Sequence, residues 1–141
     1  MAYFSEFARR VHLQECPPSL SDLARAMEAS WDRLTAYRGI FDPNNPAGGQ
    51  CYPTSRVVQW FYPGYEVASG EVWTGSSLER HFWNVRDGSD GVDRIDLSWQ
   101  QFPARSVIRN FDILRLGPAD DGQRTRDRCA LLLERVLTRL G

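Results

Sequence analysis

The chain contains no lysine: its 17 basic residues are all arginine, in a sequence of 141 residues. This absence excludes a lysine Schiff base or a lysine amine as the reactive group of an enzyme. An excess of one charge is also lacking, because 18 acidic residues bring the formal net charge to −1. The sequence therefore indicates neither nucleic acid nor an anionic membrane as a partner.

Long hydrophobic runs are missing too. No apolar run approaches the ~20 residues that cross a bilayer, and residues 1–14 lack the apolar segment of a secretory signal. Cysteine is scarce, and three cysteines at scattered spacings do not make a disulfide framework. We therefore expect free thiols in a cytoplasmic protein. The sequence has no phosphate-binding loop, dinucleotide fingerprint or iron–sulfur spacing, so no cofactor is expected.

What the sequence does contain is the pattern of one compact domain, residues 1–141. Apolar residues at helical spacing predict helices over residues 4–13, 21–36, 51–62 and 121–140. Alternating apolar residues predict strands over residues 66–73, with Gly70 as a bulge, 81–85 and 92–97, and a short strand at 113–116. Helices grouped against a small antiparallel sheet make an α+β domain.

Cys51 follows a loop rich in Gly, Pro and Asn, residues 37–50, and begins a predicted helix. A thiol becomes a strong nucleophile as thiolate, and the free N–H groups and dipole of a helix N-terminus favour that charge. We therefore expect Cys51 to be a nucleophile with a lowered pKa, alkylated rapidly at neutral pH. Cys16 and Cys129 are expected to be buried or half-buried structural thiols.

His81 and Asp96 are the predicted partners of this thiol. An imidazole takes the thiol proton and later protonates the leaving group, while a third group fixes the orientation of the ring. If the hairpin loop centres on Ser89, His81 pairs near residue 97 and lies close to Asp96. A register change of one residue decides which face of the sheet they share. Asp93 is the competing carboxylate on the same strand.

An acyl-transfer site also needs donors for the developing oxyanion. The backbone N–H of Cys51 is one expected donor, and a side-chain amide is the other. Three amides are candidates for the second donor and two indoles for the walls of a substrate cleft: Gln50, Asn45 and Asn84, and Trp83 and Trp99.

No metal site is expected. His12 and Cys16 have the spacing of a zinc pair but lack two further ligands. The carboxylates of residues 87–93 lack the terminal Glu of a calcium loop, so a plain hairpin is favoured there.

Four segments in this order resemble the YunG-like family of small bacterial proteins, over about residues 48–103: Gly49-Gln50-Cys51, His81-Phe82-Trp83-Asn84, Ile95-Asp96-Leu97-Ser98 and Gln101-Phe102. The chain departs from the family pattern at Ser98, where Thr is commoner. The resemblance implies a minimal papain-like fold. More distantly, the loop that ends at Cys51 is similar to the nucleophile loop of arylamine N-acetyltransferases and transglutaminases, which use Cys, His and Asp in this chain order.

The predicted function is a thiol-dependent acyl transfer through an acyl-thioester on Cys51, with His81 and Asp96 completing a triad. An amidase, deamidase, peptidase or amide-forming acyltransferase fits this chemistry, with a small-molecule, peptide or protein amide or thioester as substrate. Two alternatives stay open. In the first, the chain is a binding module that keeps a papain-like scaffold without turnover. In the second, it is a catalytic part that works with a partner protein or as a homo-oligomer.

Overall fold

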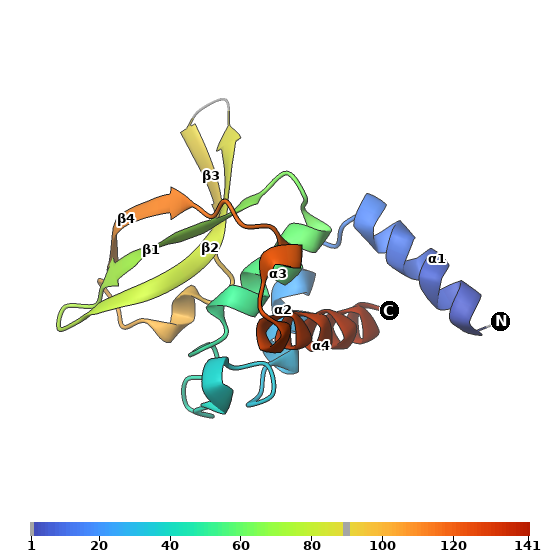
Figure 1. The fold of residues 1–141 in the computed structure, drawn as a ribbon, viewed down its shortest axis with the longest axis horizontal. Coiled ribbons are helices and arrows are strands. Elements are labelled where there is room, and N and C mark those ends of the chain that lie inside the picture. Colours follow the sequence, from blue (N-terminus) through green and yellow to red (C-terminus); the bar gives the residue numbers. More distant parts are fainter. Residues whose placement is uncertain (1, 89–90) are drawn as a thin grey trace.

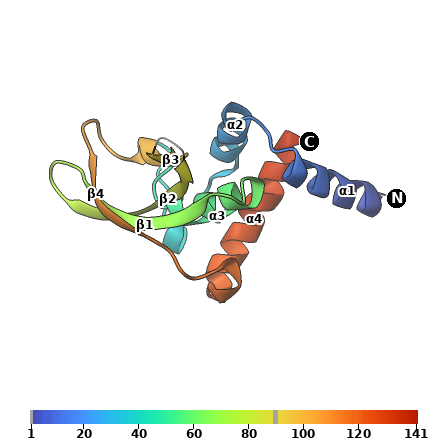
Figure 2. The same cartoon turned by 90° about the horizontal axis from the view of Figure 1, so that it is seen from above.

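A computed structural model describes residues 2–88 and 91–141. Within this part the fold is α+β, as predicted, with four α-helices and one four-stranded antiparallel sheet. Figures 1 and 2 show the sheet on one side of the molecule and helices α2, α3 and α4 on the other. Among the described residues no helix is both long and apolar enough to cross a membrane.

The first two helices, α1 (Ala2–Glu15) and α2 (Leu20–Ser30), meet at a short Pro-containing link. Ser19 caps α2 by accepting a hydrogen bond from the N–H of Asp22. The prediction that this helix reaches residue 36 is wrong. Trp31 is already extended, and the Asp32 carboxylate accepts from the N–H of Leu34 in a local turn. That turn gives the backbone an alternative to the helix.

Helix α3 (Cys51–Phe61) begins at the predicted nucleophile and is mostly buried. It contacts the sheet on one side and α4 (Gln123–Leu140) on the other. The main core lies between the helices and takes in one residue of the sheet. Its largest members are Leu23, Met27, Trp31, Phe61, Leu132 and Leu137. This packing fixes the position of α3, and so of Cys51 at its first turn.

The strands are ordered β3-β2-β1-β4, with β1 at Glu66–Trp73, β2 at Leu78–Gly88, β3 at Gly91–Ile95 and β4 at Val107–Ile113. The prediction of a last strand at residues 113–116 is wrong, because β4 ends where that strand was placed. β4 is an edge strand with mostly exposed residues, so it lacks the alternation that marks a half-buried strand.

Gly70 does not form the predicted bulge; the register shift lies between Glu71 and Val72. Gly70 instead permits a close approach. A Cβ atom there would overlap the carbonyl oxygen of Asn110 and lie 2.7 Å from the Trp83 ring. Trp83 can therefore lie across β1 and pack with Ala68, Val85 and residues of β4 in a second, smaller core.

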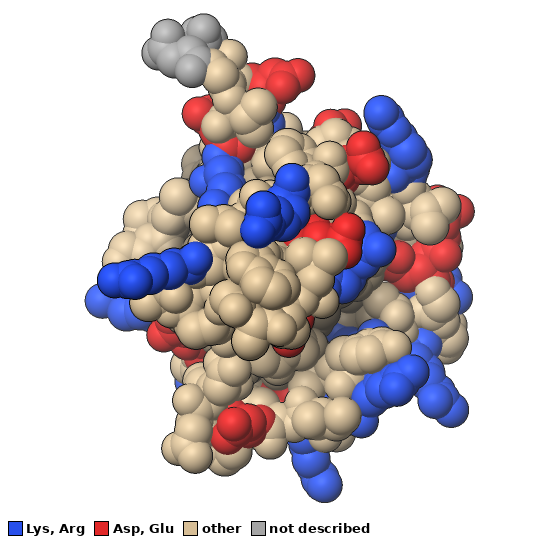
Figure 3. Space-filling view, turned by 90° about the vertical axis from the view of Figure 1, so that its left-hand side faces the viewer, with Lys and Arg blue, Asp and Glu red and all other residues tan. Residues whose placement is uncertain are grey.

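Charged side chains on the face seen in Figure 3 surround an uncharged centre, with both signs present. Cys16 lies on the surface, so the expectation that it is a buried or half-buried thiol is wrong. Its position after α1 exposes it, since this helix projects from the rest of the molecule (Figure 1). Cys129 is half-buried, as expected.

Candidate active site

Cys51 is the first residue of α3, and the loop before it is held by backbone hydrogen bonds. The N–H of Tyr37 donates to the carbonyl of Gly49 at 2.9 Å, and the N–H of Gln50 donates to that of Ala47 at 3.1 Å. Gly49 has a φ of 77°, a conformation that favours glycine. The loop therefore delivers a half-buried thiol to the N-terminus of a buried helix.

Burial raises the pKa of the Cys51 thiol to about 11 and outweighs the other influences on it. Backbone hydrogen bonds involving Phe82, Tyr52 and Cys51 itself lower this pKa, whereas the charge of Asp96 raises it. The expected lowering by the helix N-terminus is thus overturned in the resting structure, because desolvation of the thiolate is the largest effect. The thiol holds its proton at neutral pH.

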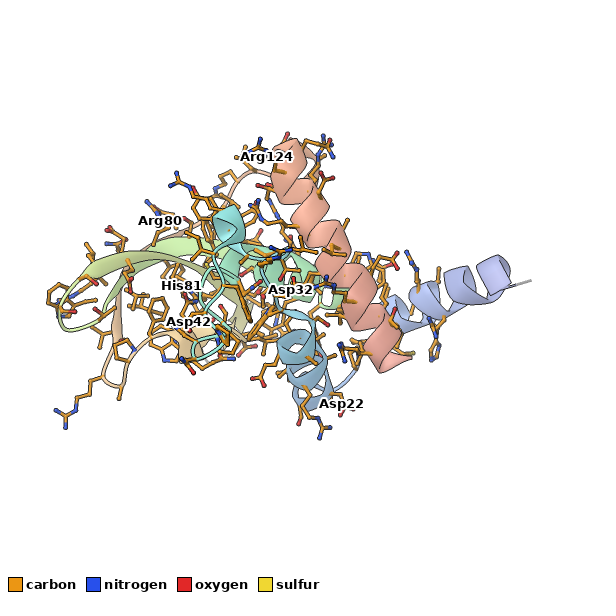
Figure 4. The ribbon with its side chains drawn as sticks, turned by 90° about the horizontal axis from the view of Figure 1, so that it is seen from below. Asp22, Asp32, Asp42, Arg80, His81 and Arg124 are labelled. Carbon is orange, nitrogen blue, oxygen red and sulfur yellow. The ribbon has the colours of Figure 1, made fainter. Side chains whose placement is uncertain are left out.

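His81 lies in β2 and is fully buried. Its ring stacks on Trp83 with 5.4 Å between ring centroids, and the edge of Phe102 approaches at 4.8 Å. Trp99 completes the aromatic surround at 5.9 Å. Figure 4 shows His81 among interior side chains, whereas the preceding Arg80 reaches the surface. The rings fix the orientation of the imidazole and keep water from it.

Asp96 meets His81 directly: Nε2 of the ring lies 2.7 Å from Oδ2 of the carboxylate. The register explains the contact. Asn84 pairs with Ile95 and Gly88 with Gly91, so His81 is level with residue 98, not 97. This difference of one residue puts His81 and Asp96 on the same face of the sheet. The residues of the hairpin loop on which that register estimate centred, 89–90, lie outside the described part.

The other nitrogen of His81, Nδ1, is buried and has no hydrogen-bond partner among the described residues. With Asp96 accepting at Nε2, the neutral ring carries its proton there and presents a lone pair at Nδ1. A buried polar atom without a partner costs about 1–3 kcal/mol. Such an atom therefore calls for an explanation, and a catalytic role is one of the recognised ones.

Arg94 is a further member of the site, which the sequence reasoning missed. Its Nη2 donates to the same Oδ2 of Asp96 at 2.8 Å, and its guanidinium lies over the Trp99 ring, 4.6 Å from the centroid. The signal was present in the sequence, because Arg94 and Asp96 are two residues apart and so share a face of an extended chain.

The competing carboxylate, Asp93, is engaged elsewhere. It is half exposed and accepts from Arg86 at 2.7 Å across the hairpin. Asp93 pairs with Arg86, and Asp96 with both Arg94 and His81. The structure thus gives the His81 partner as Asp96.

The three amide candidates each donate to a backbone carbonyl. Gln50 donates to Asp32 at 3.0 Å, Asn45 to Gln101 at 3.1 Å, and Asn84 to Ser55 at 3.0 Å. Asn84 is one residue from Trp83 along β2, so it lies on the opposite face from His81 and ties the strand to α3. The amide oxygen of Gln50 is buried and has no partner within residues 2–88 and 91–141, which leaves it as an acceptor in the residue before Cys51.

One cavity lies against α3 and another against the loop that precedes it. The larger, about 410 Å³, lies between α3 and α4 and is lined by Trp60, Cys129 and Leu133 among others. The smaller, about 240 Å³, is lined by Tyr37, Ile40 and the Gly48–Gly49 pair of the nucleophile loop. No group of three or more potential metal ligands occurs in the described residues, and the zinc pair His12 and Cys16 gains no further ligand there.

Comparisons with known proteins give a family and no activity. No curated protein and no solved structure matches the chain. The family model described as "YunG protein" matches residues 19–141, which covers α2 to α4 and both sequence segments that carry His81 and Asp96. The chain therefore belongs to the YunG family.

Proposed function

We propose that the protein catalyses thiol-dependent acyl transfer on a minimal papain-like scaffold, with Cys51 as nucleophile, His81 as general base and Asp96 as its orienting carboxylate. One observation carries the proposal: the buried His81 is held at Nε2 by Asp96, 2.7 Å away, and its Nδ1 has no partner in the described chain. A ring held this way has its basic nitrogen unoccupied and its tautomer fixed, which is what a general base requires.

The location of the thiol supports the same reading. A backbone hydrogen bond of Phe82, the residue after His81, acts on the Cys51 thiol, and the charge of Asp96 reaches it as well. The ring of Tyr52 packs edge-on against Phe82 at 4.9 Å, which joins the first turn of α3 to β2. These contacts support one site that includes both the thiol and the imidazole.

The chemistry starts from a neutral thiol and a neutral imidazole. As the sulfur attacks a substrate carbonyl, the thiol proton moves to Nδ1 of His81, and Asp96 stabilises the imidazolium through Nε2. The imidazolium then protonates the leaving amine or thiol as its bond to carbon breaks, which leaves an acyl-thioester on Cys51. Water or an amine attacks this thioester, its proton passes to His81 and then to the departing sulfur, and the free thiol returns.

Backbone N–H groups supply the oxyanion donors. The N–H groups of Cys51 and Tyr52 belong to the first turn of α3, where helical N–H groups lack an intrahelical acceptor. Both act on the Cys51 sulfur, so we expect them to lie near the carbonyl that this sulfur attacks, on whose oxygen the charge develops. A side-chain amide is then not essential as an oxyanion donor. This fits the hydrogen bonds that the three candidate amides already donate to backbone carbonyls, from Gln50, Asn45 and Asn84.

The substrate is an amide or thioester of a small molecule, peptide or protein. The 240 Å³ cavity beside Gly48 and Gly49 lies close to Cys51 along the chain, since Gly49 is at most about 7.6 Å from Cys51 between Cα atoms. Ile40 and Tyr37 line this cavity and are 71% and 56% exposed, and Asp42 and Asn45 line it as well. We propose that the apolar side of this lining takes an apolar part of the substrate, while the Asp42 carboxylate disfavours an anionic group there.

The test is to trap the acyl-enzyme. The variant with Cys16→Ser and Cys129→Ser keeps Cys51 as its one thiol and is incubated with a panel of aryl thioesters, aryl amides and glutamine peptides. Intact mass should show one acyl group per chain, and peptide mapping should place it on Cys51. Adding Cys51→Ala should abolish it. If no donor acylates Cys51, or if acylation persists after Cys51→Ala, the proposal fails.

A second function, a non-catalytic binding module that acts alone or with a partner protein, is favoured by the raised pKa of Cys51. A thiol that keeps its proton and makes no hydrogen bond to Nδ1 also fits a structural cysteine. In that case Cys51→Ala leaves the biological activity of the chain intact, whereas changes at exposed residues such as Ile40 abolish it. Complementation by the two variants in a cell that lacks the native gene separates the two functions.

A further inference from the structure

We propose that Arg94 is a positioning residue of the His81–Asp96 pair: it fixes the Asp96 carboxylate by a charge-assisted hydrogen bond and places a positive charge beside the His81 imidazole. This placement stands on the geometry of the pair itself. Its value for catalysis rests on the proposed function.

One carboxylate oxygen carries the argument. Oδ2 of Asp96 accepts from Nε2 of His81 at 2.7 Å and from Nη2 of Arg94 at 2.8 Å. The Asp96 side chain is 5% exposed and that of His81 is 0% exposed, so the pair is screened weakly by solvent. Both donors share one oxygen of the Asp96 carboxylate. Because the Arg94 guanidinium already neutralises part of the negative charge on that oxygen, less of it is left to stabilise an imidazolium at His81.

Arg94 is fixed in this place by aromatic rings. Its guanidinium lies 4.6 Å from the Trp99 centroid and 5.8 Å from that of Trp83, the two indoles that also surround His81. Cation–π contacts of this kind orient an arginine that is otherwise 39% exposed. Arg94 thus lies between solvent and the carboxylate.

The titratable and charged groups around the His81–Asp96 pair determine the direction in which Arg94 should affect protonation of His81. The Cys51 thiol of α3 and the Asp96 carboxylate are the titratable groups near His81 in the described chain, and Arg94 of β3 is the cation. The other neighbours of the ring, Trp83 and Phe102, carry no charge. A nearby cation disfavours protonation of an imidazole, so removing the positive charge of Arg94 should make the His81 ring easier to protonate. A neutral ring is what a protonated thiol needs as its base.

The same hairpin provides a matched control. Arg86 and Asp93 form an ion pair of similar length, 2.7 Å against 2.8 Å for Arg94 and Asp96, with both side chains about half exposed and no histidine attached. Removing Arg86 therefore repeats the loss of an arginine from an Arg–Asp pair on this hairpin without touching the pair that holds His81.

The experiment is a proton NMR titration of the imidazole C–H signals in the full chain. Only two histidines are present, and the exposed His12 serves as an internal reference. We expect Arg94→Met to raise the pKa of His81 by about one pH unit relative to the wild type. Arg94→Lys, which keeps the charge, should leave it within a few tenths of a unit, and Arg86→Met should leave it unchanged. His12 should not move in any variant.

The proposal is overturned if Arg94→Met leaves the pKa of His81 in place, or if Arg86→Met shifts it equally. If Arg94→Met does not fold, Arg94→Gln keeps a donor to Asp96 without the charge, and the same upward shift is required of it. Acylation of Cys51 is measured separately in the same variants. A shift in the pKa of His81 without any acylation of Cys51 contradicts the proposed function but supports the role of Arg94. Acylation of Cys51 without such a shift supports the proposed function but contradicts the role of Arg94.

Discussion

Cys51 and Cys129 are two half-buried thiols of one molecule, and burial raises the pKa of each to about 11. Their neighbours differ. Cys51 begins α3 beside backbone N–H groups and the His81–Asp96 pair. Cys129 lies within α4, faces the charges of Asp121, Arg56 and Arg128, and lines the 410 Å³ cavity.

The comparison teaches that the resting pKa of a thiol does not identify a nucleophile here. Burial raises the pKa of both thiols to about 11, so thiolate content does not favour Cys51 over Cys129. What distinguishes Cys51 is that the His81–Asp96 pair lies on the neighbouring strand with Nδ1 of His81 buried and unpartnered among the described residues. Under the proposed function, this nitrogen takes the thiol proton during attack, and the difference between the two sites lies in that base.

The largest expected effect comes from removing that base. His81→Gln should slow acylation of Cys51 by about 100- to 10,000-fold, because general-base assistance is lost. The measurement is the single-turnover rate of acylation followed by intact mass, in the background that lacks Cys16 and Cys129. His12→Gln is the control, since His12 is exposed on α1. If His81→Gln and His12→Gln acylate at the same rate, Cys51 receives no general-base assistance from His81 and does not differ from Cys129 in this respect.

A smaller loss is expected from the orienting carboxylate. Asp96→Asn should slow acylation on the order of tenfold to a thousandfold, because the amide no longer fixes the tautomer with its proton at Nε2. Asp93→Asn, which breaks the matched ion pair with Arg86, should leave the rate unchanged. Equal losses in the two variants argue for a general effect on the hairpin and against the triad.

The local structure around Cys51 and the bounds of strand β1 could be predicted from the sequence. The Gly-rich loop before Cys51 and the buried helix after it correctly predicted a thiol at a helix start. Strand β1 was predicted with its observed bounds, since apolar alternation and flanking Gly and Pro mark them. These features depend on neighbouring residues, which is what a sequence pattern records.

Features that depend on contacts between residues far apart in the chain could not be predicted from the sequence. β4 pairs with β1 as an exposed edge, and nothing in its own residues marks a strand of that length. The hairpin register differs from the estimate by one residue, and that single residue decides whether His81 and Asp96 share a face. The pKa of Cys51 was expected to fall, but burial by the packed sheet and helices raises it.

Alkylation sharpens the comparison of the two thiols further. Iodoacetamide should modify both slowly at neutral pH, and the rate at Cys129 should rise about tenfold per pH unit toward a pKa of about 11. Cys51 should react on the order of tenfold faster than Cys129 at neutral pH, because His81 accepts its proton. The advantage should vanish in His81→Gln. Identical pH profiles for the two thiols in the wild type contradict the proposed base. Peptide mapping of the alkylated sites gives both rates from one sample.

The smallest expected effect treats the two thiols alike. The pKa of each is raised in the folded chain from 9.0 to about 11, so each favours the folded state fully below pH 9 and loses this contribution as the pH rises to about 11. The free energy of unfolding should fall across this window, and Cys129→Ala should remove roughly 1–2 kcal/mol of the fall. Urea unfolding at the two ends of the window measures it, and Cys51→Ala should remove a similar amount. A decline that neither substitution reduces means that the two thiols are not protected by burial, and the premise of the comparison fails.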